Sequence, residues 1–142
     1  MSWYNDLIAI RDAIKNTLIT VTEIKSIVFG KREHIGQLSF PCLFIIFNMD
    51  DILTVEATQG GRQHNYNWEL VLISRNPDVE QGEEEILQVA GNCYDKLILD
   101  NTLGGVCLWS EVLSVESDSV RVDAGSALQW ATINLKTVKF RG

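Results

Sequence analysis

Apolar residues recur at intervals of three and four near the start of the chain, a spacing that gathers them on one face of a helix. These residues are Leu7, Ile10, Ile14 and Leu18. Asn5 or Asp6 can cap the first turn. Trp3 and Tyr4 precede it, where they can staple the helix start or anchor a partner. The pattern predicts an amphipathic helix over residues 5–18.

A second stripe with helical spacing follows the stop signal NPD at 76–78. It consists of Ile86, Val89, Ala90, Cys93, Leu97 and Ile98. Residues 83–85 are three glutamates, and negative charge in a first turn interacts favourably with the helix dipole. We therefore expect a helix over residues 83–99 that begins with these glutamates.

The region between the two helices has the patterns of strands. Residues 26–30, SIVFG, form a short one. The continuous apolar run at 41–49, PCLFIIFNM, predicts a strand that is buried on both faces and ends before Asp50 and Asp51. A weaker strand is expected within ILTVEAT, residues 52–58, before a glycine turn.

Residues 64–75 alternate between large apolar and mostly polar side chains, which predicts a long strand with one buried face. Two further strands are expected at 106–117 and 127–140, joined by the polar segment 118–126. Core packing is the expected role of the three tryptophans on these strands, Trp68, Trp109 and Trp130.

The predicted order is helix, several strands, helix and two strands, with most strands adjoining one another in the sequence. This order favours an α+β fold: one twisted, largely antiparallel mixed sheet with two helices packed on one face. The polar positions suggest that the other face of the sheet is not buried within the monomer. They include Asn65, Asn67, Glu69, Asn134 and Lys136.

Length and charge narrow the class of protein. A chain of 142 residues is the size of one domain, so we treat residues 1–142 as a single domain. The formal net charge is −7, and such a field repels a phosphate backbone, which argues against direct binding to nucleic acid. No stretch reaches the ~18 apolar residues of a membrane span, and no basic segment precedes the first apolar run. We expect a soluble protein that is not exported.

The sequence shows no pattern that indicates catalysis. The soft metal ligands lack the short spacings that preorganise a zinc site; they are His34, His64, Cys42, Cys93 and Cys107. The three cysteines are far apart among apolar neighbours, which favours buried free thiols. No nucleophile lies in a recognisable catalytic segment, and no titratable groups converge. We therefore predict neither an enzyme nor a metal or cofactor site.

The glycine pair Gly104-Gly105 raises the question of phosphate binding. A phosphate loop needs its amides at the start of a following helix, whereas this pair follows a predicted helix and precedes a predicted strand. The lysine and hydroxyl of a P-loop are also missing. A helix exit followed by a glycine turn is the simpler interpretation.

Several segments in this order resemble the tail terminator proteins of long-tailed phages and related viruses, whose close relatives are tail-completion and neck proteins. They are the helix opening LIAIRDAIKNTL, the strand PCLFIIF, the long strand YNWELVLI, the helix end leading into LDNTLGGVC, and the closing strand ALQWATINLKTVKFR. The resemblance covers nearly the whole chain and rests on pattern, because none of these segments is chemically unique.

The resemblance implies a structural virion protein at the tail-neck junction, assembled in the host cytoplasm. Such proteins form a ring, typically a hexamer, that caps the tail tube, stops its polymerisation and provides the surface for head-tail joining. The implied partners are other copies of the chain, the tail tube protein and a head-tail connector or neck protein, with no membrane. DNA would be only passing cargo, and an acidic lumen would let it slide.

The resemblance also implies that Asp100 to Gly105 is a structural turn that fixes the second helix against the sheet. Asp100 or Thr102 would bond local backbone groups, and Gly104 or Gly105 would adopt the positive φ that the reversal needs.

The loop Lys31-Arg32-Glu33-His34 gathers basic residues in an acidic chain and precedes Gly36. We hypothesise that Lys31, Arg32, Glu33 and His34 contact a neighbouring subunit or the tail tube. A solvated loop without function is the alternative.

Three other interpretations remain open at the level of sequence. A neck, tail-completion or minor tail protein of similar fold is the nearest. A small cytosolic ligand-binding or enzymatic α+β domain would require a pocket of convergent polar residues, and none is evident. A host-derived interaction module would act through the exposed face of the sheet.

Overall fold

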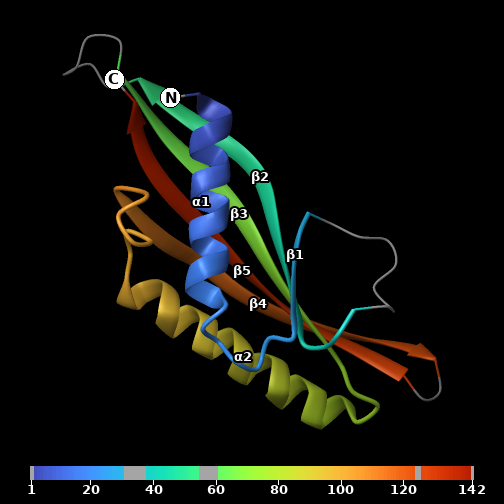
Figure 1. Cartoon of the computed structure of the whole chain (residues 1–142). Helices are drawn as coiled ribbons and strands as arrows, with labels where there is room; N and C mark the ends of the chain where they lie inside the picture. Colours follow the sequence, from blue (N-terminus) through green and yellow to red (C-terminus); the bar gives the residue numbers. More distant parts are fainter. Residues whose placement is uncertain (1, 31–37, 55–60, 124–125, 142) are drawn as a thin grey trace.

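The computed structural model describes residues 2–30, 38–54, 61–123 and 126–141, which form a five-stranded sheet and two helices (Figure 1). The elements are α1 (Trp3–Leu18), β1 (Ser26–Phe29), β2 (Cys42–Thr54), β3 (Arg62–Arg75), α2 (Val79–Leu99), β4 (Trp109–Asp123) and β5 (Ser126–Arg141). The strand order across the sheet is β1-β2-β3-β5-β4. Only the β1-β2 pair is parallel among these neighbours, so the predicted α+β fold with a largely antiparallel sheet is confirmed.

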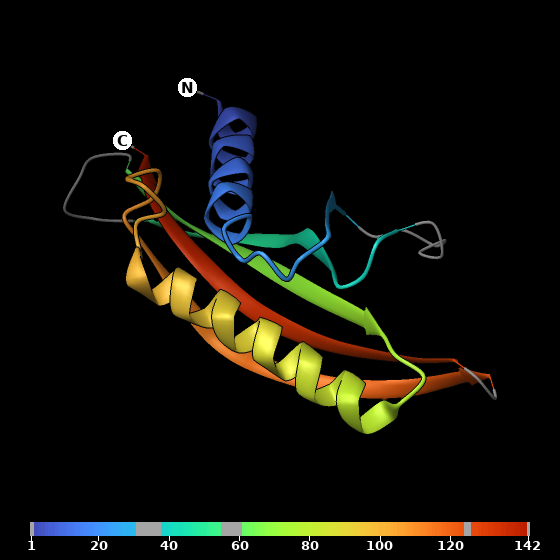
Figure 2. The same ribbon diagram turned by 60° about the horizontal axis from the view of Figure 1, so that its bottom comes forward.

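Both helices lie against the same face of the twisted sheet (Figures 1 and 2). The main hydrophobic core lies between them, because it combines buried residues of α1 and α2 with alternate residues of the central strands. Strand β3 contributes the predicted set Tyr66, Trp68, Leu70 and Leu72. Burial of each such side chain stabilises the fold by about 1.5–3 kcal/mol. The indole of Trp68 also donates a hydrogen bond of 3.0 Å to the hydroxyl of Thr137 on β5.

Both helices begin earlier than their apolar stripes predict. Ser2 caps α1 by accepting a hydrogen bond from the amide of Asn5, and the helix starts at Trp3. Asp78 caps α2, and its carboxylate accepts from two amides of the first turn. The three glutamates at 83–85 therefore lie beyond the first turn, because the stop signal at 76–78 is itself the cap.

Strand β2 is longer than predicted, since Asp50 and Asp51 lie within it. The expected strands at 41–49 and 52–58 merge because β3 provides a partner along their length as far as Thr54. A bulge between Phe47 and Met49 shifts the register at the point where the apolar run gives way to polar residues. Only the first four residues of β2, Cys42 to Ile45, are buried on both faces.

The last two strands are also longer than predicted. Strand β4 begins at Trp109, three residues after the predicted start, and pairs with β5 as far as Asp123. Most of the polar segment expected to join the strands is therefore part of the β4-β5 pair. Its backbone pairing overrides a composition that is typical of a loop.

The face of the sheet opposite the helices, which we call the open face, is largely polar. A small apolar cluster centred on Val28, Cys42 and Phe44 covers its β1-β2 end. Cross-strand polar pairs occupy the rest: Asn48 with Glu69 at 3.0 Å, Asn134 with Ser114 at 2.8 Å and Lys136 with Glu111 at 3.2 Å. The prediction that this face is not buried within the monomer is correct for Asn67, Glu69, Asn134 and Lys136, and wrong for Asn65, which is buried.

Two of the three strand tryptophans lie outside the core. Trp68 is buried as predicted, whereas Trp109 on β4 is exposed and Trp130 is half-buried. Trp130 pairs with Ile73 and alternates with the core residue Ala131, so its ring lies on the open face. In the described residues, neither helix is long and apolar enough to cross a membrane.

Candidate assembly surfaces and a buried polar cluster

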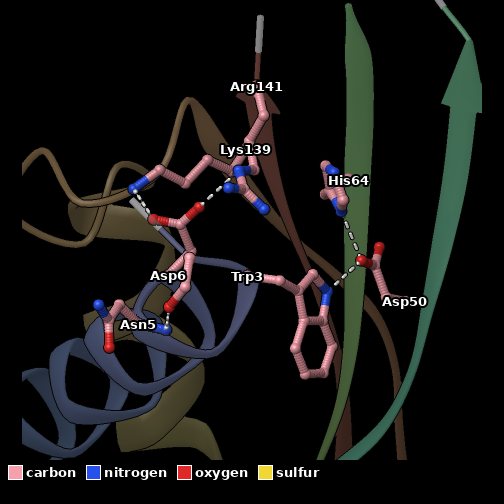
Figure 3. Close-up of polar contacts among 8 residues, drawn as sticks. Trp3, Asn5, Asp6, Asp50, His64, Lys139 and Arg141 are labelled. Atoms are coloured by element: carbon pink, nitrogen blue, oxygen red, sulfur yellow. Dashed lines mark hydrogen bonds and ion pairs between the residues drawn. The ribbon is translucent and has the colours of Figure 1, made fainter.

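A polar cluster ties the start of α1 to the end of the sheet where both chain termini lie (Figure 3). The indole of Trp3 donates a hydrogen bond of 2.7 Å to Asp50 Oδ2, and the Nδ1 atom of His64 contacts the same oxygen. The Trp3 ring packs edge-on against Phe47, with 5.8 Å between ring centroids. Trp3 therefore acts within the fold as a staple for the helix.

Asp6 forms the second half of this cluster (Figure 3). Its carboxylate is 2% exposed and pairs with Lys139 Nζ at 3.4 Å and Arg141 Nε at 3.1 Å. Both cations come from β5, and their side chains remain partly exposed. Asp6 therefore joins α1 to β5. Asp50 on β2 binds Trp3 of α1 and His64 of β3, so it joins the same helix to these two strands.

Tyr66 lies in the core beneath both acids. Its hydroxyl is buried without a hydrogen-bond partner among the described residues, and so is the Oδ1 atom of Asp50. Burial, followed by the negative charges of Asp50 and Asp6, raises the pKa of Tyr66 to about 12. The phenol therefore stays protonated at neutral pH. The contacts of the cluster hold the start of α1 against the sheet.

The three cysteines are free and buried, as the sequence predicts. Burial raises the pKa of Cys42 to about 11, of Cys93 to about 12 and of Cys107 to about 11. These thiols are protonated at neutral pH, which removes the nucleophilic thiolate form. Among the residues that the structure describes, no group of three His, Cys, Asp or Glu side chains could hold a metal ion.

The turn after α2 is built from the residues that the sequence singles out. Asp100 accepts hydrogen bonds from the amides of Thr102 and Gly104, at 3.2 and 2.8 Å, and from the Thr102 hydroxyl at 2.9 Å. Thr102 Oγ1 accepts from the amide of Gly105. Gly104 and Gly105 both have positive φ, of 75° and 88°, and Leu103 precedes them with φ of 52°. These hydrogen bonds lower the pKa of Asp100, with the Thr102 hydroxyl as the largest cause.

Substitution of Gly105 by alanine should destabilise the protein by about 1–3 kcal/mol, because an L side chain is strained at positive φ. Gly91→Ala is the matched control, since a Cβ atom meets nothing within 4 Å at either position. Gly91 lies inside α2, so its substitution should raise stability by about 0.5–1 kcal/mol. Urea unfolding of both variants measures the difference. Equal effects of the two substitutions would show that the turn needs no glycine.

The residues hypothesised to contact a neighbouring subunit or the tail tube lie outside the part of the chain that the structure describes: Lys31, Arg32, Glu33 and His34. The hypothesis for this loop remains a prediction.

A surface that the sequence pattern did not predict lies along β4, which forms one edge of the sheet, and the adjoining side of α2. Large apolar side chains are 40–55% exposed there: Leu87, Tyr94 and Ile98 on α2, and Trp109, Leu113 and Val115 on β4. We call these six residues the β4 edge. A groove of about 300 Å³ runs between the two elements, with Tyr94, Ile98 and Val112 in its lining.

The sequence contained a signal for this surface. Leu87, Tyr94 and Ile98 repeat at helical spacing, offset from the buried stripe that includes Ile86 and Val89. Ile98 was predicted to belong to the buried stripe, and the structure shows it to be 54% exposed. Two apolar stripes on one helix indicate two contacts, and only one of them is made within the monomer.

No family model and no curated protein sequence matches the chain. Among solved structures, the fold is similar to a chain from the virion of a native gene transfer agent particle. The TM-score is 0.46 at 8% sequence identity, and the match covers 90% of this chain and 92% of that chain.

Proposed function

We propose that this chain is a structural virion protein that forms a ring on the end of a tail tube, stops tube polymerisation and provides the surface for head-tail joining. The β4 edge carries the proposal, because it exposes six large apolar side chains on adjoining elements of the fold. Six large apolar side chains exposed along one edge of the fold are explained best by contact with another protein. We infer the kind of assembly, a ring on a tail tube, from the segments that resemble tail terminator proteins.

A ring needs heterologous contacts, in which one surface of a subunit meets a different surface of the next. The ring would contain other copies of this chain, six by the resemblance, between the tail tube protein and a head connector. The proposed role is a structural one. It requires binding surfaces and no catalytic site.

The proposal predicts that the purified protein assembles into closed rings. Native mass spectrometry over a range of protein concentrations, with and without tail tubes, measures the subunit number directly. We expect a single closed species of about six subunits that tail tubes enrich. Monomer alone at every concentration, both with and without tubes, would contradict the proposal.

The proposed role in tail assembly is tested in a virus that lacks its own tail terminator. The gene for this chain, or for a chimeric version matched to that tail tube, should restore normal tail length and head joining. Overlong tails despite well-folded rings would show that the chain has another place in the particle.

A further inference from the structure

We propose that neighbouring copies of this chain bind head to tail, with the β4 edge of one copy against the opposite edge of the sheet in the next. This inference rests on the proposed ring and names the two surfaces that would build it. The second surface, which we call the β1 edge, consists of Lys15, Ile19, Ile24, Lys25 and Ile27. They line a groove of about 230 Å³ between the end of α1 and strand β1.

The β1 edge combines apolar and basic side chains. Ile19 is 58% exposed, and Ile24 and Ile27 are half-buried beside it. Lys25 is exposed, and Lys15 lies over the ring of Phe29, with 5.4 Å from its ammonium to the ring centroid. Among the residues that the structure describes, none that lines this groove is acidic.

The β4 edge has the opposite charge. Glu84 lies on the exposed side of α2 three residues before Leu87, and Glu111 lines the groove while its carboxylate pairs with Lys136 on the open face. Helix α2 carries five carboxylates and residues 109–118 carry three, against a single basic residue, Lys96. The two edges are therefore complementary in charge, and each offers apolar side chains beside a groove.

This charge pattern favours a head-to-tail contact over a symmetric one. If two β4 edges met, their carboxylates would face one another, and like charges opposed across an interface weaken binding. A β4 edge against a β1 edge brings carboxylates to lysines instead. Strands β1 and β4 lie at opposite ends of the strand order, so each copy can bind one neighbour on either side.

A charge-swap experiment on the full chain tests this contact. The first variant, Lys15→Glu with Lys25→Glu, makes both edges acidic. The second, Glu84→Lys with Glu111→Lys, places two lysines on the β4 edge, where they would meet the lysines of the β1 edge. We expect each variant alone to associate about tenfold or more weakly than the wild type, because like charges then meet at every contact.

An equimolar mixture of the two variants should restore assembly, because each reversed edge then meets an oppositely reversed partner. Native mass spectrometry should show closed rings that contain the two variants in equal numbers. Rings from either variant alone at the wild-type concentration, or a mixture that stays monomeric, would overturn the head-to-tail contact.

Two controls separate charge effects from folding effects. Asp51→Lys with Glu69→Lys changes the net charge as much as the second variant does, but on strands β2 and β3 instead of β4 and α2, and should leave assembly intact. Glu111 also pairs with Lys136, so Glu84→Lys with Glu116→Lys repeats the test without disturbing that pair. Wild-type rings together with unaffected swap variants would overturn only this inference, whereas a wild-type chain that never assembles would overturn the proposed function as well.

Discussion

Asp6→Asn is expected to lower the free energy of unfolding by about 2–4 kcal/mol, although the substitution keeps the size of the side chain. The carboxylate is 2% exposed and lies against two cations of β5, Lys139 and Arg141. Its removal takes away the negative charge that both cations contact. Both cations are partly exposed, and water reaching them keeps the cost below that of a fully buried pair.

Asp12→Asn is the matched control, because it makes the same change on the same helix. Asp12 pairs with Arg11 at 3.6 Å, and its side chain is 53% exposed. A surface pair of this kind contributes about 0–1 kcal/mol. Guanidinium unfolding of both variants gives the comparison. Similar losses from the two substitutions would show that the polar cluster does not hold α1 to the sheet.

The second large effect is unfolding by alkali. The buried thiols have pKa values raised by burial from 9.0 to about 11 for Cys42, about 12 for Cys93 and about 11 for Cys107. The unfolded chain therefore releases protons at a lower pH than the folded chain. Stability is fully present below pH 9 and is lost as pH rises through 11 to 12. Each such group removes about 1.4 kcal/mol per pH unit within this window.

Urea unfolding measured at intervals of half a pH unit between pH 8 and 11, under reducing conditions, records this loss as a slope. Cys93→Ala removes one of the three thiols, so its slope should be shallower by the equivalent of one proton. We expect the variant to be less stable than the wild type at pH 8 because of the cavity, and this offset does not affect the comparison of slopes. Identical slopes for the variant and the wild type would mean that Cys93 ionises equally in both states.

The sequence predicted best where one period of apolar residues persisted over a whole element. The four apolar residues of β3 alternate without interruption, and the structure buries all four. The stripe of α1 behaves in the same way, with Ile10, Ile14 and Leu18 fully buried. In both elements the local pattern and the tertiary environment favour the same structure.

Prediction failed where distant residues decide the structure. The sequence predicts that a strand ends before Asp50, because a carboxylate interrupts an apolar run. It lies within β2 since Trp3 and His64 are its partners, 47 and 14 positions away in the sequence. The same reason explains Asp6, a predicted cap residue whose main contacts come from β5. Polar residues with such partners cannot be distinguished from exposed ones by local pattern.

The exposed apolar surface of α2 and β4 could not be predicted from the sequence for a related reason. The apolar residues of α2 form two stripes, and periodicity alone does not tell which stripe faces the core. Strand order decides this, because α2 packs over β5 and β4 and leaves Leu87, Tyr94 and Ile98 along the outer strand. Strand order depends on pairings between distant segments, which one sequence does not reveal.

The strand order also determines when the strands can pair during folding. The centre of the sheet is the β3-β5 pair, which joins residues 62–75 to residues 126–141 and encloses α2 and β4 between them in the sequence. During synthesis, β2 and β3 emerge long before β5, and a two-stranded hairpin is at best marginally stable by itself. One edge of β3 stays unpaired, and its apolar face lacks part of the core, until β5 has left the ribosome. Nascent chains should therefore depend on chaperones over this interval, and refolding should be slow for a domain of this size because the decisive contacts span long loops.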